Sequence, residues 1–413
     1  MVTLSIVVAG CGSETVERPT SSAQGSTGQR HAATRTERTQ AVLDQIAQAV
    51  EAGDLDAFMA AVSDRDRLFP RRGKMIFDNL NSLPLNAFRL TARSGSAELS
   101  ASRHRQLGPD SWVQQATLSW QLEPDTSPAV HTVWLSMTAN GDTAQLAGTT
   151  DIPPDRAGPL PLWWLVPVVA EQGDDVTALV DAGLKADSQW ARAGGAALAR
   201  IRSQVRGIDS GWSGTLVVQV PSTTAILEQM LAVRRGSYDQ IAAVTWADGT
   251  NTARAPLRIV VNPAPAGKLS DLGTQLLLAH EATHVATHSV DSPAPAWMVE
   301  GFADYIAYQA YPQARKASAA PLLDRVKNGK GPASLPDNEE FRAGTDRLEL
   351  AYAEAWLACQ YVADQYSPEQ LHELYRELDS GRNFEQAARS VLEVTSAQFV
   401  SGWRGYLLAL ARR

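Results

Sequence analysis

The sequence predicts an α+β protein with two folded units. We expect helices and a curved antiparallel sheet in the first unit, and a small sheet with a mostly helical C-terminal part in the second. Apolar residues recur with a helical period over residues 40–82, alternate with polar residues over 86–151, and become helical again from 269 onward. With 413 residues, of which 44% are hydrophobic, the chain is long enough to bury two packed cores.

Composition excludes several classes of protein. The formal net charge is −8 and no stripe of Lys and Arg occurs, which argues against a nucleic-acid partner. No apolar run approaches the roughly 18 residues that a membrane-spanning helix needs, so a polytopic membrane protein is excluded. The two cysteines, Cys11 and Cys359, lie in different contexts, so disulfides do not hold the fold together. We interpret Cys359 as a small buried residue of a helix.

The N-terminal segment carries the features of an export signal. Residues 1–11 form a short apolar run that ends in Val8-Ala9-Gly10-Cys11, and signal peptidases accept small residues around their cleavage site. This ending resembles the lipobox of bacterial lipoproteins, which implies a lipidated Cys11 and a protein anchored on the extracytoplasmic face of the cell membrane. The ten residues before Cys11 contain no Lys or Arg, so two alternatives stay open: a true start upstream of Met1, or an accidental apolar N-terminus.

Residues 12–39 and 40–155 are expected to form a tether and a first folded domain. The tether is rich in Ser, Thr, Gly, Gln, Arg and Glu and nearly lacks large apolar side chains, so we expect it to be flexible. In the domain, residues 116–122 alternate between apolar and polar, as a half-buried strand does. Asn140-Gly141 predicts a hairpin turn between strands at 130–137 and 144–150.

Helices followed by an antiparallel meander resemble the nuclear-transport-factor-like superfamily. The resemblance rests on topology alone and implies a cone-shaped fold. Its role stays open between a ligand pocket and a spacer, and we expect a non-catalytic accessory domain.

The Pro- and Gly-rich residues 153–161 predict a boundary, after which residues 162–413 form the second domain. Its first half should contain strands at 166–169, 216–220 and 257–261 and helices at about 184–206 and 223–233. The last of these strands precedes the helix with the site described next. We expect it to help form a sheet edge that binds an extended peptide by strand addition.

The residues that indicate chemistry are His280-Glu281-Ala282-Thr283-His284, on an apolar helix. Residues four apart lie on one helix face, so His280 and His284 can both direct an imidazole at one metal ion. Glu281 projects about 100° round the helix, where it can act as a base on a water molecule held by the metal. Two ordinary helix histidines are the alternative.

A catalytic zinc ion needs a third protein ligand and an open position for water. Thr287 and Val290 stand where a metzincin would have Gly and His, and His288 lies about 12 Å along the helix axis from His280. Asp291-Ser292-Pro293-Ala294-Pro295 ends the helix, and Glu300 follows at a matching depth in the next one. We therefore expect Glu300 to be the third ligand.

Asp304 lies one turn beyond Glu300 and can accept the outer N–H of a ligand histidine. Solvated helix carboxylates are the alternative interpretation of both acidic residues.

The pair His-Glu-x-x-His and Trp297-x-x-Glu300-Gly301-x-Ala303-x-Tyr305 resembles the gluzincin metallopeptidases, most closely the peptidase MA-like group of bacterial envelope proteins. The resemblance covers about residues 275–306. It implies a zincin-like domain with one zinc ion per chain and Glu281 as general base. Tyr352 resembles the tyrosine that stabilises the oxyanion in such enzymes, with a packing aromatic as the alternative. No Gly-Ala-Met-Glu-Asn element is present, which argues against aminopeptidase specificity.

These observations lead us to expect a lipid-anchored, extracytoplasmic zinc metallopeptidase whose substrate is a peptide or protein. The sequence leaves two alternatives open. The same ligands could serve a non-catalytic zinc-binding lipoprotein, although a purely structural site has no use for the base Glu281. The chain could also be a binding or scaffold lipoprotein in which the first domain carries the function.

Overall fold

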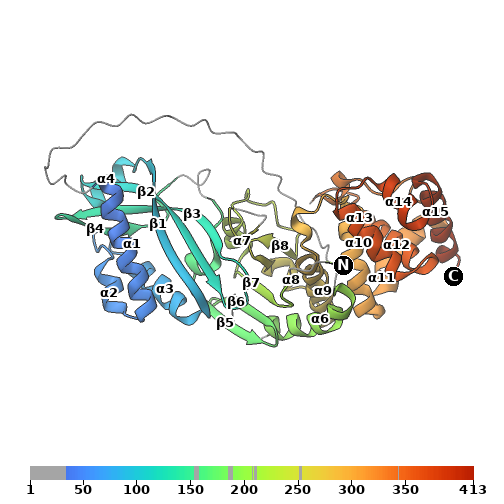
Figure 1. Cartoon of the computed structure of the whole chain (residues 1–413), viewed down its shortest axis with the longest axis horizontal. Helices are drawn as coiled ribbons and strands as arrows, with labels where there is room; N and C mark the ends of the chain where they lie inside the picture. Colours follow the sequence, from blue (N-terminus) through green and yellow to red (C-terminus); the bar gives the residue numbers. More distant parts are fainter. Residues whose placement is uncertain are drawn as a thin grey trace.

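The computed structural model describes residues 34–152, 158–184, 189–206, 208, 212–250, 254–342 and 344–413. Three parts follow one another along its long axis: an N-terminal unit of helices and an antiparallel sheet, a central mixed sheet, and a C-terminal group of helices (Figure 1). This combination confirms the α+β class. The lipobox with Cys11 and the tether up to residue 33 lie outside the described residues.

The first helix, α1, spans Arg35–Ala52 and corrects the predicted end of the tether at residue 39. Thr34 is its N-cap and accepts a hydrogen bond from the backbone N–H of Glu37, whose side chain in turn accepts from the Thr34 backbone. This reciprocal capping starts the helix within the polar segment, before the first apolar residues of the helical pattern. Apolar periodicity alone predicts a later start, because the capping residues and the first turn of the helix are polar.

The N-terminal unit continues with α2 Leu55–Ala60, α3 Phe69–Ser82, β1 Leu85–Ala97, α4 Ala101–Leu107, β2 Ser111–Leu122, β3 Ala129–Asn140 and β4 Thr143–Gly148. The four strands form an antiparallel sheet in sequence order. As predicted, the apolar residues of 116–122 are fully buried while the polar ones between them are partly exposed. The predicted turn joins β3 and β4, and Gly141 adopts a φ of 60° there. The short helix α4 was not predicted.

The central part contains α5 Leu162–Leu165, β5 Val168–Gly173, β6 Val176–Asp181, α6 Gln189–Val205, β7 Leu216–Val220, α7 Thr224–Met230, β8 Ala243–Ala247 and β9 Leu257–Val261. Its sheet has the order β5-β6-β7-β9-β8, with β6, β7 and β9 parallel and both outer strands antiparallel to their neighbours. The expectation that β9 forms a sheet edge is wrong, because β8, which was not predicted, pairs with its outer side. Strand β6 was also missed.

Both faces of the central sheet are buried, each in a different core. Ala178 and Val218 point into a core shared with α6, α9 and the C-terminal helices. Leu179 and Val217 point to the opposite side, where they share a core with α7 and the N-terminal unit. Helix α5 belongs to this second core, since Trp163 packs edge-to-face on Trp120 of β2 at 5.6 Å. The sheet therefore lies between the N-terminal unit and the C-terminal helices.

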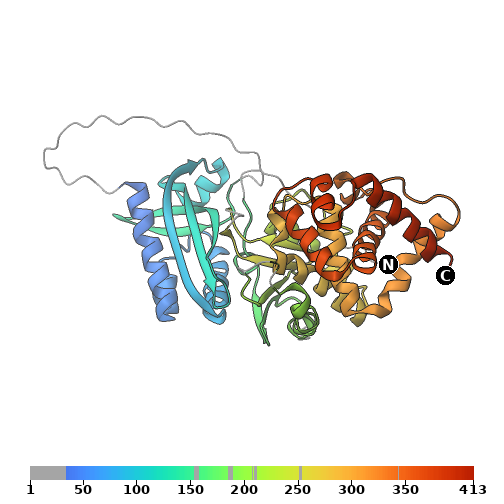
Figure 2. The same cartoon turned by 45° about the vertical axis from the view of Figure 1, so that its right-hand side comes forward.

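The C-terminal helices are α8 Pro263–Ala266, α9 Asp271–Thr287, η3 Ser289–Asp291, α10 Ala296–Ala310, η4 Pro312–Ala314, α11 Arg315–Lys327, η5 Asn338–Phe341, α12 Leu348–Gln365, α13 Pro368–Asp379, α14 Phe384–Leu392 and α15 Ser396–Ala411. Figure 2 shows the helices from α10 onward, coloured orange to red, gathered at the end of the molecule opposite the N-terminal unit, whereas α9 packs against the central sheet. Among the described residues, no helix combines the length and apolarity needed to cross a bilayer. Cys359 is buried in α12 with a free thiol, as expected from its apolar surroundings.

Candidate metal centre

Helix α9 carries the two histidines and is buried over most of its length. It begins at the N-cap Ser270, which accepts a hydrogen bond from the backbone N–H of Gly273 at 3.2 Å. Every residue from 277 to 287 is buried, because α9 packs between the central sheet, α6 and α10. The half-buried His288 ends the helix with a φ of 51°. Polar side chains inside such a helix are stable only where they have partners.

The structure brings the three predicted ligands together. The Nε2 atoms of His280 and His284 lie 2.9 Å apart, and Glu300 Oε2 lies 3.3 Å from the first and 3.7 Å from the second. All three side chains are buried. Within the described parts of the chain, their ligand atoms lie close enough to one another that the group could hold a metal ion. The predicted pairing of α9 with α10 is thereby confirmed.

The spacing of these atoms fits a tetrahedral zinc ion. With zinc–nitrogen and zinc–oxygen distances of about 2.0–2.1 Å, two ligand atoms at the tetrahedral angle are separated by about 3.3 Å. The three observed distances range from 2.9 to 3.7 Å and so bracket this value. Two imidazoles and one carboxylate are also a donor set that zinc accepts in catalytic sites.

Each ligand histidine is oriented by a partner on its other ring nitrogen. His280 Nδ1 lies 2.9 Å from Asp304 Oδ1, and His284 Nδ1 lies 2.7 Å from Ser289 Oγ. When both Nδ1 atoms donate their proton to these oxygens, the lone pairs of both Nε2 atoms face the same space. The predicted contact of Asp304 with a ligand histidine is confirmed. Ser289 was missed, although it lies in the turn that directly follows α9.

The surroundings of the two glutamates shift their pKa values in opposite directions. Burial alone would raise the pKa of Glu300, but the hydrogen bonds and charges of the two histidines outweigh it and lower the pKa to about 2. Burial raises the pKa of Glu281 above its ordinary value, and the histidine charges offset this only in part. Two carboxylates whose pKa values move apart suit different tasks, one as an ionised ligand and one as a proton acceptor.

In the part of the chain that the structure describes, Glu281 has a hydrogen-bond partner at only one of its two carboxylate oxygens. Its Oε2 accepts a hydrogen bond of 2.7 Å from Thr245 Oγ1 in β8, and its Oε1 is buried without a hydrogen bond among the described residues. As a carboxylate oxygen it can accept a hydrogen bond or a proton from a molecule that enters the site. Sequence reasoning missed Thr245 because the strand that carries it was not recognised.

Helix α12 brings Tyr352 to the site through a close contact with α10. A Cβ atom on Gly301 would lie 2.4 Å from the carbonyl oxygen of Ala355, so only glycine allows the two helices to approach this closely. The ring centre of Tyr352 lies 6.3 Å from that of His280 and 5.3 Å from that of Phe341. The structure therefore places Tyr352 beside His280, and its role at the oxyanion stays a prediction.

A cavity of about 570 Å³ ends at this group of residues. Asp304 and Tyr352 form part of its wall, together with apolar side chains that include Leu276 of α9 and Trp356 of α12. Asp304 contacts His280 and Tyr352 lies beside it, so the cavity reaches within one side chain of His280.

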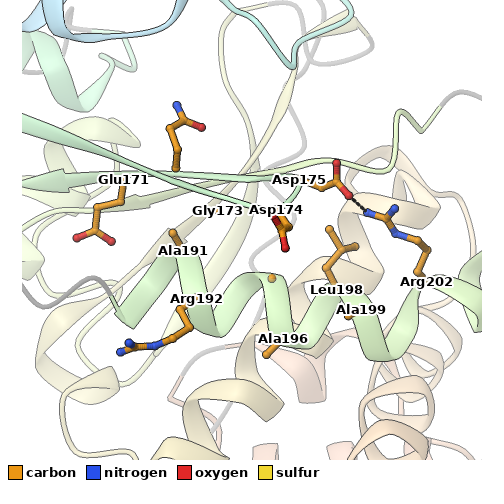
Figure 3. A pocket seen from close by; sticks show the side chains of 12 residues that line it. Glu171, Gly173, Asp174, Asp175, Ala191, Arg192, Ala196, Leu198, Ala199 and Arg202 are labelled. Atoms are coloured by element: carbon orange, nitrogen blue, oxygen red, sulfur yellow. Dashed lines mark hydrogen bonds and ion pairs between the residues drawn. The ribbon is translucent and has the colours of Figure 1, made fainter.

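Size alone does not identify the site. A cavity of about 740 Å³ lies between the β5–β6 turn and α6, where Asp175 and Arg202 form an ion pair of 2.6 Å (Figure 3). Its lining contains carboxylates, arginines and small residues but no histidine or cysteine. It therefore lacks the mixed nitrogen and oxygen donors that the α9–α10 hairpin provides.

Comparisons with protein-family models, with curated proteins and with solved structures find no match to this chain. The site residues must therefore be interpreted from their own geometry and chemistry.

Proposed function

We propose that this chain is a zinc-dependent metallopeptidase with a zincin-like domain and one zinc ion per chain. The observation that supports it is the buried convergence of His280, His284 and Glu300 at distances suited to tetrahedral zinc. Glu281 lies next to the first ligand with one carboxylate oxygen unpaired. A structural zinc site normally has four protein ligands and needs no such base.

In this proposal, each residue of the site has a different role in peptide hydrolysis. When bound, zinc supplies a Lewis acid for the peptide carbonyl and lowers the pKa of the attacking water to about 7. Glu281 would accept a proton from the attacking water and donate it to the leaving amine as the peptide C–N bond breaks. Tyr352, through its hydroxyl, stabilises the negative charge that develops on the carbonyl oxygen. Asp304 and Ser289 hold the imidazoles in the required tautomer and orientation.

The location of the activity is part of the proposal. A lipid on Cys11 would anchor the chain to the extracytoplasmic face of the cell membrane, where it would act on a peptide or protein. We expect Cys11→Ala to move the protein from the membrane fraction to the soluble fraction of the cell. Unchanged fractionation would contradict the anchor without affecting the catalytic proposal.

The decisive test combines metal content with peptide cleavage in the full chain. We expect one zinc ion per chain in the wild type and none in His284→Ala, with His104→Ala in α4 as a control that keeps the metal. Glu281→Gln should keep zinc but lose cleavage of a peptide library by orders of magnitude, whereas Glu339→Gln, at an exposed position, should not. A wild type that binds no zinc, or a fully active Glu281→Gln variant, would refute the proposal.

A further inference from the structure

Strand β8 connects the proposed base to the N-terminal unit. Its residues alternate, so that Ala243 faces the core around α9 while Val244 faces the core shared with the N-terminal sheet. Thr245 points to the α9 side, is 2% exposed, and contacts Glu281 through its hydroxyl. β8 is an outer strand of the central sheet, so only β9 holds it laterally within the sheet.

The end of β8 is fixed by a buried network of charged groups. Asp248 directly follows the strand and accepts a hydrogen bond of 3.0 Å from Arg258 Nε. Arg258, which is 1% exposed, also forms a two-pronged ion pair with Asp125, with distances of 2.5 and 2.7 Å. His131 Nε2 lies 3.1 Å from the second oxygen of Asp248. Asp125 and His131 belong to the β2–β3 region, so two of these four groups come from the N-terminal unit.

Backbone contacts also join the N-terminal sheet to the segment that follows β8. Val130 of β3 pairs with Gly249, and its carbonyl accepts a hydrogen bond of 2.7 Å from the N–H of Thr250. A Cβ atom on Gly249, whose φ is 147°, would lie 2.7 Å from the same carbonyl oxygen. The N-terminal sheet thus contacts the segment after β8 so closely that only glycine fits.

The surroundings of Asp248 favour the charged form of its carboxylate. Burial alone would raise the pKa of Asp248, but His131 and Arg258 outweigh it and hold this pKa below its ordinary value. Removing one member of a buried ion pair leaves the other charge without compensation, which is strongly destabilising for the local structure. Substitution of Asp125 should therefore weaken the contacts that hold the end of β8.

We propose that Thr245 is a positioning residue for Glu281, and that the N-terminal unit, through Asp125 and His131, fixes β8 so that the Thr245 hydroxyl stays within reach of the carboxylate. The proposal rests on the proposed peptidase function. It makes the N-terminal unit part of the catalytic architecture, in place of the expected accessory role. Orientation of a catalytic group matters because a displacement of about 1 Å can reduce the rate by roughly 100-fold.

The first test compares Thr245→Val, which keeps the shape but removes the hydroxyl, with Thr245→Ser, which restores it. In the full zinc-loaded chain, Thr245→Val should lower kcat by roughly 10- to 100-fold with KM and zinc content unchanged, and Thr245→Ser should recover most of the loss. A Val variant with wild-type kcat, or a Ser variant no better than Val, would overturn the positioning role. Lack of activity in the wild type would instead refute the peptidase function itself.

The second test measures β8 without relying on activity. In metal-free full chain, amide hydrogen exchange over Ala243–Ala247 should become faster in Asp125→Asn than in the wild type. Asp175→Asn, which disrupts an exposed ion pair at the other side of the same sheet, is the matched control and should leave β8 unchanged. If Asp125→Asn does not fold, His131→Gln tests the same link with a smaller expected change. Wild-type exchange in a folded variant would overturn the role of the N-terminal unit.

Discussion

The hydrogen bond between Asp304 and His280 allows a quantitative test of the metal centre. It measures 2.9 Å and is buried, with the Asp304 side chain 9% exposed. Partners of this kind contribute roughly 10- to 100-fold to metal affinity, because they orient the imidazole and increase its basicity. Asp304→Asn keeps an acceptor in place but removes the charge, so we expect zinc to bind about tenfold more weakly, a loss of about 1.4 kcal/mol. Asp304→Ala removes both and should approach 100-fold.

The assay is competition for zinc between the full chain and a chromophoric chelator near neutral pH. Asp175→Asn provides a control of the same chemical change at a site with no contact to the histidines, and its zinc affinity should equal that of the wild type. Unfolding by heat, followed in the zinc-loaded state, distinguishes a weakened site from a misfolded chain. Zinc affinity unchanged in both Asp304 variants would show that His280 does not bind the metal through Nε2, which would refute the geometry described above.

Three further changes test neighbouring parts of the structure. Tyr352→Phe should lower kcat by about 100- to 1,000-fold with zinc content unchanged, and an unaffected kcat would reduce Tyr352 to a packing residue. Gly301→Ala should destabilise the fold by about 1–3 kcal/mol in chemical denaturation, because its Cβ would lie 2.4 Å from the Ala355 carbonyl oxygen. Burial raises the pKa of Glu354 to about 7 despite the charge of Arg347, so its contribution to stability is complete below pH 4.5 and is lost as the pH rises to about 7. Glu354→Gln should therefore raise the melting temperature above pH 7 and change it little below pH 4.5, and a pH-independent difference would contradict this origin.

The ligands could be predicted from sequence because they depend on local geometry. His280 and His284 share a helix face by spacing alone, and the prolines at 293 and 295 mark the break between two helices. α10 begins at Ala296, where the pattern placed it, so Glu300 falls opposite the histidines. Local rules of helix period and helix ending were sufficient here.

The partners of these residues depend on contacts between distant segments, and sequence patterns do not reveal them. Thr245 lies in a five-residue strand whose hydrophobic pattern is too short to recognise, and its contact with Glu281 joins residues 36 apart. His131, an isolated histidine to which the sequence gave no role, pairs with Asp248 across the boundary between the two units. Nothing in the neighbourhood of either residue indicates its partner.

The central sheet shows why the two predicted domains are not independent. Val217 and Val218 are neighbours in β7, yet they belong to different cores, because the strand is covered on both faces. Strands buried on both faces have continuous apolar runs without alternation, as residues 216–218 do. Helices of the second unit lie on both faces: α6 and α9 share a core with one face, whereas α5 and α7 share a core with the other face and with the N-terminal unit. The apolar run in β7 therefore already implied that other elements cover the sheet on its second face. The boundary predicted at residues 153–161 divides the chain into two units, but the shared core and the Arg258–Asp125 ion pair hold these two units together.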